Sequence, residues 1–345
     1  MDRIGLTRAS VLAPAVTFLR RRQAPLEQLL VKASLPAWAI DDPDRLIPTS
    51  VVARLLTHAA RAERLETFGI LAGQAAGIET LGTYGRLIRR SRTLGDALDA
   101  TVRYHPTFSS NGRMWLVRRG DDVELCQAFS ARYDREWEQA SHYILTLMLS
   151  IVRLAAGPTW RPAEVSFQTG EAPAVRTVDA LSAARVAFAQ RSTAIVLPKA
   201  LLREPLKQPM LDIEISRETI EAWRASAPPT TFTESVGHVV EMLSWQGYPD
   251  IVVTADILGM SVRTLQRHLA AVGLTHESLV GRARFATAAS LLEETDTKIL
   301  DIALDLGYSD HAHFTRAFHR WAGCSPQEFR RRCAERRNRS TPAGT

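Results

Sequence analysis

The sequence has 345 residues, of which 46% are hydrophobic, so it is long enough for two domains with well-formed cores. Its formal net charge of +6 permits a nucleic-acid partner without requiring one. Its three cysteines are scattered and no stretch approaches the ~20 apolar residues of a spanning helix, which excludes a disulfide framework and a helical membrane protein and favours a cytoplasmic chain.

Residues 1–224 are predicted to form one α+β domain. Apolar residues at helical spacing indicate helices at residues 26–30, 51–56, 66–76, 84–90, 94–104 and 136–155. Short apolar runs indicate strands at residues 114–117, 123–126, 165–167, 186–188 and 194–197. The first two strands flank a short turn and form a hairpin, and the whole pattern predicts an antiparallel sheet covered by helices.

The first domain carries no pattern typical of catalysis. Its histidines, at positions 58, 105 and 142, are dispersed, no nucleophile elbow is present, and its glycines lack the spacing of a phosphate-binding loop. We therefore predict no enzymatic activity, no metal and no cofactor. Four side chains are candidates for the wall of an effector-binding cavity, the alternative being ordinary core and surface aromatics: Tyr84, Trp115, His142 and Tyr143.

Residues 225–232 are predicted to be a linker. Small residues and the paired Pro228 and Pro229 stop the preceding helix and resist packing. The stretch from Thr231 to Glu234 then has the pattern of a capping box, which would open a second domain.

A repeat dominates the second half of the chain. Ala255–Ser261 is followed, forty-eight positions later, by Ala303–Ser309, each with apolar residues before a glycine and a hydrophobe and serine after it. A small residue lets two helices approach, glycine permits the backbone angles of the turn, and a polar cap starts the next helix. The pattern therefore predicts two helix-turn-helix motifs.

The repeat slips by one residue after the second turn. The segment Leu265–Leu269 matches Phe314–Phe318, forty-nine positions later, which makes Asp310 the equivalent of the cap Ser261. We expect Gly259 and Gly307 in the two turns, a long connecting helix over residues 282–294, and an all-α domain over residues 233–332. A basic, flexible tail is expected over residues 333–345.

Charge is unevenly distributed in this half. Residues 230–345 contain 13 basic and 13 acidic residues, so this half of the chain has no net excess of positive charge. Residues 262–276 and 311–326, which hold the two predicted second helices, nevertheless contain no acidic residue. Proximity to phosphate requires such acid-free helices.

Several residues then resemble the signature of AraC-type transcription regulators. The match covers about residues 236–332 and is carried by Asp301-Ile302-Ala303, Gly307-Tyr308-Ser309-Asp310, Phe314, Arg316-Ala317-Phe318, Trp321, Gly323, Ser325-Pro326 and Phe329-Arg330. The first domain resembles, more weakly, the effector domain of the branch with ornithine-utilisation activators, through segments such as Ile47-Pro48, Phe68-Gly69-Ile70 and Val196-Leu197-Pro198. Arabinose-binding regulators have a barrel in that place, so a sugar ligand does not follow.

The resemblance implies two recognition helices that enter successive major grooves of double-stranded DNA. The expected contacts with the first groove are Arg263, Thr264, Gln266 and Arg267, and those with the second are His311, Ala312, His313 and Arg316. Arginine can bind guanine with two hydrogen bonds and glutamine can bind adenine, whereas Ala312 can only contact a thymine methyl or leave space. The second helix is therefore expected to discriminate less.

The leading hypothesis is a sequence-specific transcription regulator whose first domain senses an unknown small molecule and forms a homodimer, with RNA polymerase as a further partner. One alternative is an architectural or constitutive DNA-binding protein without an effector. Another is a DNA-repair or enzymatic protein fused to the same DNA-binding domain, against which the missing nucleophile and metal patterns count.

Overall fold

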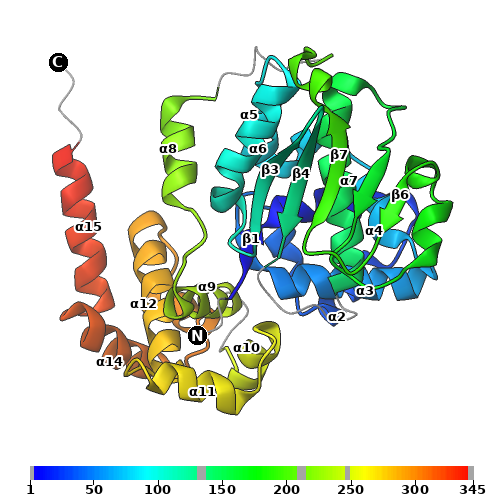
Figure 1. The fold of residues 1–345 in the computed structure, drawn as a ribbon. Coiled ribbons are helices and arrows are strands. Elements are labelled where there is room, and N and C mark those ends of the chain that lie inside the picture. Colours follow the sequence, from blue (N-terminus) through cyan, green and yellow to red (C-terminus); the bar gives the residue numbers. More distant parts are fainter. Residues whose placement is uncertain (1–3, 130–136, 208–214, 245–248, 341–345) are drawn as a thin grey trace, which may run out of the picture. The chain divides into compact units, whose positions relative to one another are not determined.

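The computed structural model describes residues 4–129, 137–207, 215–244 and 249–340. The chain divides into two compact units, with the division between Thr231 and Phe232. Figure 1 shows the helices and strands of both units.

The unit before Phe232 begins with a short strand pair and a series of helices. Strands β1 (Leu6–Arg8) and β2 (Leu46–Pro48) pair antiparallel, with Thr7 opposite Ile47. The helices that follow or intervene are α1 (Ala13–Arg21), α2 (Leu26–Lys32), α3 (Thr49–Glu63), α4 (Phe68–Gly73), α5 (Gly82–Arg89) and α6 (Leu94–Phe108). Single 3₁₀ turns lie between them, at Ala9–Leu12 (η1), Ala37–Ile40 (η2) and Ile78–Leu81 (η3).

A five-stranded sheet forms the centre of this unit, in the order β3-β4-β7-β5-β6 among the described residues. Its strands are β3 (Arg113–Arg119), β4 (Asp122–Ala128), β5 (Glu164–Ser166), β6 (Arg185–Ala187) and β7 (Thr193–Pro198). The predicted hairpin is β3-β4, and β4-β7 and β5-β7 are also antiparallel. The pair β5-β6 is parallel, because a crossover with two 3₁₀ turns, η5 (Pro173–Thr177) and η6 (Asp179–Leu181), separates the strands.

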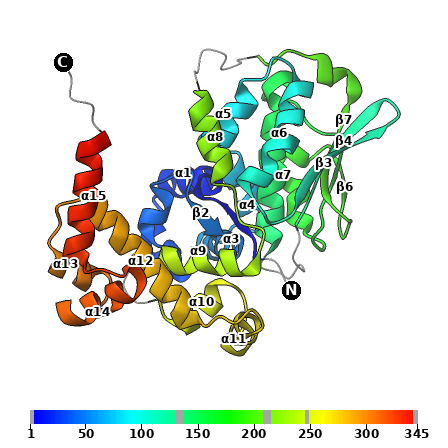
Figure 2. The same cartoon turned by 90° about the vertical axis from the view of Figure 1, so that its left-hand side faces the viewer.

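Helices cover one face of this sheet (Figure 2). Helix α7 (Glu138–Ala156) buries most of its length, including Tyr143, Met148 and Val152, against the sheet and helices α3, α4 and α6. The predicted α+β fold is thus confirmed. After β7 come the 3₁₀ turn η7 (Lys199–Arg203) and helix α8 (Arg217–Ala225), whose Trp223 is buried.

The unit after Thr231 is helical. Its elements are α9 (Phe232–Ser244), α10 (Ile251–Ile257), α11 (Val262–Ala270), α12 (His276–Glu294), α13 (Ile299–Asp305), α14 (His311–Ala322) and α15 (Pro326–Ser340). Helices α10-α11 and α13-α14 are the two predicted helix-turn-helix motifs, and α12 connects them. The second motif packs on a buried cluster of Ala288, Leu292, Ile302, Ala303, Leu306, Phe314 and Phe318.

Two predicted boundaries in this unit were wrong. The connecting helix begins at His276 rather than at residue 282, because Thr275 and Ser278 form a reciprocal capping box without a glutamate. The tail expected to be flexible from residue 333 is helical to Ser340, and Cys333 is buried. Ion pairs four residues apart stabilise that helix, while residues 341–345 lie outside the described part.

Candidate nucleic-acid interface and ligand cavity

The two helix-turn-helix turns have the same backbone geometry. Gly259 and Gly307 adopt left-handed φ angles of 68° and 74°, which other residues rarely adopt. Beyond each glycine the chain closes the preceding helix with the same hydrogen bond, from Met260 N–H to the Ala255 carbonyl (3.0 Å) and from Tyr308 N–H to the Ala303 carbonyl (2.9 Å). The sequence repeat is therefore also a structural repeat.

A side-chain cap starts the second helix of each motif. The Ser261 hydroxyl accepts from the Thr264 N–H at 3.2 Å, and the Asp310 carboxylate accepts from the His313 N–H at 2.6 Å. The latter hydrogen bond is the main cause that lowers the pKa of Asp310 below its usual value. The inserted residue in the second turn thus leaves both helices with a cap at their first turn.

Helix α11 presents its predicted contact residues to solvent. Leu265 and Leu269 are buried, whereas Arg263, Gln266 and Arg267 are exposed on the opposite stripe. The remaining candidate, Thr264, is half-buried beside the cap, where its hydroxyl lies 2.9 Å from the Ser261 hydroxyl.

Helix α14 repeats this arrangement with different side chains. Phe314 and Phe318 are buried in the cluster of the second motif. The predicted contacts are all exposed: His311, Ala312, His313 and Arg316. His313 also packs edge-on against Tyr308, with ring centroids 5.5 Å apart, so its ring is held at the start of the helix.

Arg284 of α12 holds the second turn, a role that the sequence reasoning missed. Its side chain is buried, its Nε donates to the Leu306 carbonyl at 2.6 Å, and its guanidinium lies 3.7 Å from the centroid of the Tyr308 ring. The signal available in the sequence was a single arginine among small and apolar residues on the buried side of α12. In the first motif the contact with α12 is made by α10 instead, through a 3.0 Å hydrogen bond between Thr254 Oγ1 and His276 Nε2.

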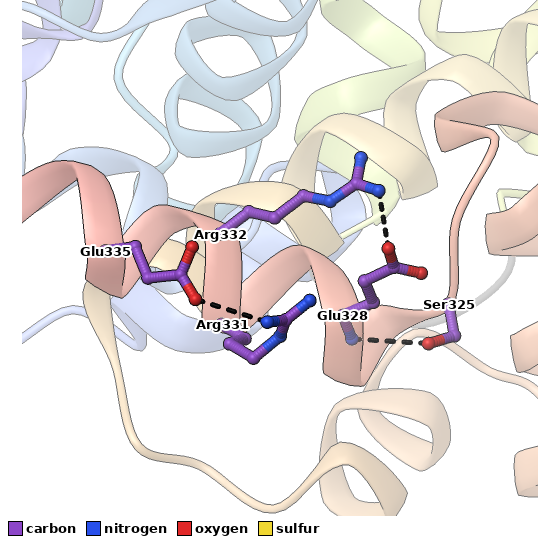
Figure 3. A network of polar contacts seen from close by, with 5 residues as sticks. All are labelled: Ser325, Glu328, Arg331, Arg332 and Glu335. Atoms are coloured by element: carbon purple, nitrogen blue, oxygen red, sulfur yellow. Dashed lines mark hydrogen bonds and ion pairs between the residues drawn. The ribbon is translucent and has the colours of Figure 1, made fainter.

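Two arginines of α15, Arg331 and Arg332, form ion pairs within their own helix (Figure 3). Arg332 pairs with Glu328 at 2.5 Å and Arg331 with Glu335 at 3.3 Å. Arg330 donates to the Thr297 carbonyl at 2.6 Å. By contrast, no ion pair within the described ranges involves Arg263, Arg267 or Arg316. These three cations are available for an external anion.

The first unit contains a cavity between its helices and the covered face of the sheet. Its volume is about 70 Å³, several times what a single water molecule needs. The wall comes from η1, α3, α5, α6 and α7, with Met114 and Gln127 contributed by the sheet. Its half-buried lining residues, at the accessible side, are Met114, Phe129, Trp137 and Ile144.

Two of the four predicted effector residues line this cavity. Tyr84 and Tyr143 both belong to its wall. Trp115 lies on the opposite sheet face, because it neighbours Met114 on the same strand and successive side chains point to opposite faces. His142 is fully buried beside Phe167 (ring centroids 5.0 Å apart), away from the cavity lining.

The cavity also contains polar residues that the sequence reasoning did not single out as ligand contacts. These are His105, Asn111 and Gln127, all buried. Burial lowers the pKa of His105 to about 4, so its imidazole is neutral near pH 7. No sequence signal marks these residues, since only the folded chain brings α6, the loop before β3 and β4 together.

Neither unit presents a metal site or a membrane span within its described residues. No group of three or more His, Cys, Asp or Glu side chains could hold a metal ion there. Likewise, no described helix has the length and apolar character needed to cross a bilayer.

Comparison with known proteins places both units in one family. Residues 24–206 match the arabinose-binding domain of AraC transcription regulators, and residues 254–332 match a helix-turn-helix domain. The chain therefore belongs to the AraC-type transcription regulators, with an N-terminal effector-like domain and a C-terminal DNA-binding domain.

Curated relatives extend over most of the chain. The ornithine utilization regulator of Pseudomonas aeruginosa is 24% identical over 278 residues, covering 80% of this chain and 82% of that protein. The transcriptional regulator VirS of Mycobacterium tuberculosis is 26% identical and covers 96% of this chain and 98% of its own. Among solved structures, the regulator CdpR of Pseudomonas aeruginosa aligns with a TM-score of 0.42 at 19% identity, covering 89% of this chain and 96% of that chain.

Proposed function

We propose that this regulator recognises a specific DNA sequence through α11 and α14, which enter successive major grooves, and that a small molecule in the cavity of the first unit controls it. The observation that carries the proposal is the equivalence of Arg267 and Arg316. Each lies exposed on the second helix of a capped helix-turn-helix, opposite the buried stripe, and neither has an acidic partner among the described residues.

Base recognition follows from the side chains that differ between the two helices. On α11, Arg263 and Arg267 can each bind a guanine with two hydrogen bonds, and Gln266 can bind an adenine. On α14 the residue equivalent to Arg263 is Ala312, which can contact a thymine methyl group. Helix α11 therefore supplies most of the discrimination, and the two helices together read an asymmetric site.

Each unit has a separate role in the proposed function. Residues 1–224 sense the effector and mediate homodimerisation, residues 225–232 link the units, and residues 233–332 bind DNA. RNA polymerase is the partner through which DNA binding changes transcription. The cavity between helices and sheet supports the sensing role, because its wall is mainly apolar and partly accessible and contains a few buried polar groups.

Alanine substitution of the two equivalent arginines tests the proposal. In the full chain, Arg267→Ala and Arg316→Ala should each weaken binding to a selected operator by roughly 1–3 kcal/mol and relax specificity at one base pair. The matched control is Arg332→Ala, because Arg332 is paired with Glu328 on α15. Unchanged affinity and specificity in both recognition-helix variants would refute the assignment of the grooves.

The salt dependence of binding separates this function from architectural binding. A sequence-specific regulator should bind its operator far more tightly than random DNA of equal length, roughly 10³-fold or more at physiological salt. A steep salt dependence with no sequence preference would instead indicate an architectural protein.

A further inference from the structure

The chemistry of the cavity in the first unit indicates which class of effector it accepts, and this inference rests on the proposed control by a small molecule. Within the part of the chain that the structure describes, no Asp, Glu, Lys or Arg belongs to the cavity wall. His105 is the one titratable nitrogen base among these lining residues, and its low pKa of about 4 keeps it uncharged at neutral pH. A charged ligand group would therefore lose its hydration without gaining a counter-charge.

Most hydroxyl groups around the cavity are already used within the protein. Tyr143 donates to the Val11 carbonyl at 2.6 Å and Tyr84 to the Thr101 carbonyl at 3.0 Å. The remaining lining hydroxyls donate to backbone carbonyls in the same way: Thr49 to Gly5 at 3.1 Å, Thr7 to Phe108 at 3.4 Å and Ser109 to Leu6 at 3.4 Å. These residues present rings and methyl groups to a ligand rather than free donors.

Two buried amides keep unused hydrogen-bonding capacity. Asn111 Nδ2 and Gln127 Oε1 are inaccessible to water, and neither has a hydrogen-bond partner among the described residues. The side chains are only 5% and 2% exposed, and both line the cavity. A buried polar atom without a partner is costly, so a site that contains one donor and one acceptor of this kind is suited to a ligand that satisfies both.

The backbone that carries both amides is fixed in position by its surroundings. Gln127 belongs to strand β4, which has a neighbour on each side, and lies between Met114 of β3 and Thr193 of β7. The Asn111 N–H donates to the Ser109 hydroxyl at 3.3 Å. Asn111 also packs so closely against the backbone of Gly5 that a Cβ there would lie 2.5 Å from the Asn111 Cβ. Only rotation of each side chain is then needed to turn its amide toward a ligand in the cavity, so the backbone loses little entropy when the ligand binds.

We infer that the effector is an uncharged, mainly apolar molecule with one hydrogen-bonding head group, such as an amide, that pairs with Asn111 and Gln127. An ionised amino acid or a carboxylate finds no counter-charge among the lining residues that the structure describes. A free sugar carries several hydroxyl groups, and the lining offers too few unused partners to satisfy them all.

A series of matched probes tests this class directly on the full chain. Octanamide, octanoate and octylammonium share an apolar chain and differ in the charge of the head group. Isothermal titration calorimetry should detect octanamide binding, and both charged probes should bind at least roughly tenfold more weakly, because each would bury an uncompensated charge.

Variants locate the binding and identify the amides. Asn111→Leu and Gln127→Met keep the side-chain size and remove the polar group, so each should weaken octanamide binding roughly ten- to a hundredfold. Ala140→Phe, which fills the cavity from α7, should abolish it. The matched control is Gln190→Met on the opposite face of the sheet, which should bind octanamide like the unmodified protein. Circular dichroism of each variant checks that it is folded.

The outcomes separate this inference from the proposed function. If octanoate or octylammonium binds as tightly as octanamide and Ala140→Phe removes that binding, the cavity is a ligand site but the uncharged class is wrong. If none of the three probes binds, or if both amide variants bind octanamide normally, the inference is overturned. DNA binding by the same protein samples, measured in parallel, tests the regulator function independently of either result.

Discussion

Arg8 in the first unit and the recognition-helix arginines in the second unit use the same guanidinium group in opposite ways. In the second unit, Arg267 and Arg316 extend from a helix surface into solvent without an acidic partner among the described residues. In the first unit, Arg8 is 2% exposed and donates to the backbone carbonyls of Asp44, Thr107, Trp223 and Ser226. Its guanidinium also lies 5.3 Å from the Trp223 ring centroid.

This difference in the exposure of charged groups indicates which kind of ligand can bind to each region. Exposed cations are suited to DNA, a polyanion, because they lose little hydration before they meet a phosphate or a base edge. The described wall of the cavity in the first unit contains no ionised side chain, which favours an uncharged ligand there. Arginine is thus a structural residue at position 8, whereas we propose that it binds DNA at positions 267 and 316.

Replacing the buried arginine should give the largest effect. Arg8→Met removes donors from several buried carbonyls and the contact with Trp223, so it should destabilise the first unit by about 3–5 kcal/mol. Denaturant unfolding followed by tryptophan fluorescence measures this loss. The matched control, Arg267→Met, should change stability by less than about 0.5 kcal/mol, because that side chain is exposed. Equal losses in both variants would contradict the comparison.

Acidification should destabilise the first unit through its buried histidines. Burial lowers the pKa of both His105 and His142 to about 4, from 6.5. Below pH 6.5 the unfolded chain binds protons that the folded chain does not, so this stability is complete above pH 6.5 and is lost as the pH falls toward 4. The loss should be about 1.4 kcal/mol per pH unit for each histidine.

His142→Phe isolates one of these two contributions. The new ring would occupy the site next to Phe167, which already packs against the imidazole at 5.0 Å. Between pH 6 and 5, unfolding of this variant should take up about one proton fewer. Its unfolding free energy should therefore change by about 1.4 kcal/mol less per pH unit than that of the unmodified protein. An unchanged slope would show that His142 is protonated within the fold.

The smallest effect is expected for the paired arginines of α15. Arg332→Ala removes a surface ion pair with Glu328, which is worth less than about 1 kcal/mol. Its effect on operator affinity should be smaller than that of Arg267→Ala, and the slope of log affinity against log salt should stay unchanged. A slope reduced by about one unit would show that Arg332 contacts a phosphate instead.

The sequence predicted the features that depend on local chemistry. Gly259 and Gly307 each lie where the chain requires a left-handed angle, and Ser261 and Asp310 each lie one residue before a helix. These signals are local because a cap or a turn needs only its nearest neighbours along the chain. The length of helix α15 was not predicted, because ion pairs between successive turns stabilise it and its basic composition alone does not indicate those pairs.

The cavity could be predicted only in part, because distant segments build it. Trp115 and Met114 are adjacent, and only the register of β3 against β4 decides which of them faces the helices. Asn111 and Gln127 are candidates for ligand contacts because the fold buries one polar atom of each without a hydrogen-bond partner among the described residues. The neighbouring residues along the sequence do not indicate this. Tyr84 and Tyr143 were identified as candidates, but their hydroxyls are bound to backbone carbonyls.

Protection of guanine N7 in the major groove tests the central proposal most directly. On an operator selected with the full chain, the unmodified protein should protect two clusters of guanines about one helical turn, ~10 base pairs, apart. Arg267→Ala should lose protection in one cluster only, and Arg316→Ala in the other only. A single protected cluster, or the loss of both clusters in either variant, would contradict the account of two recognition helices in successive grooves.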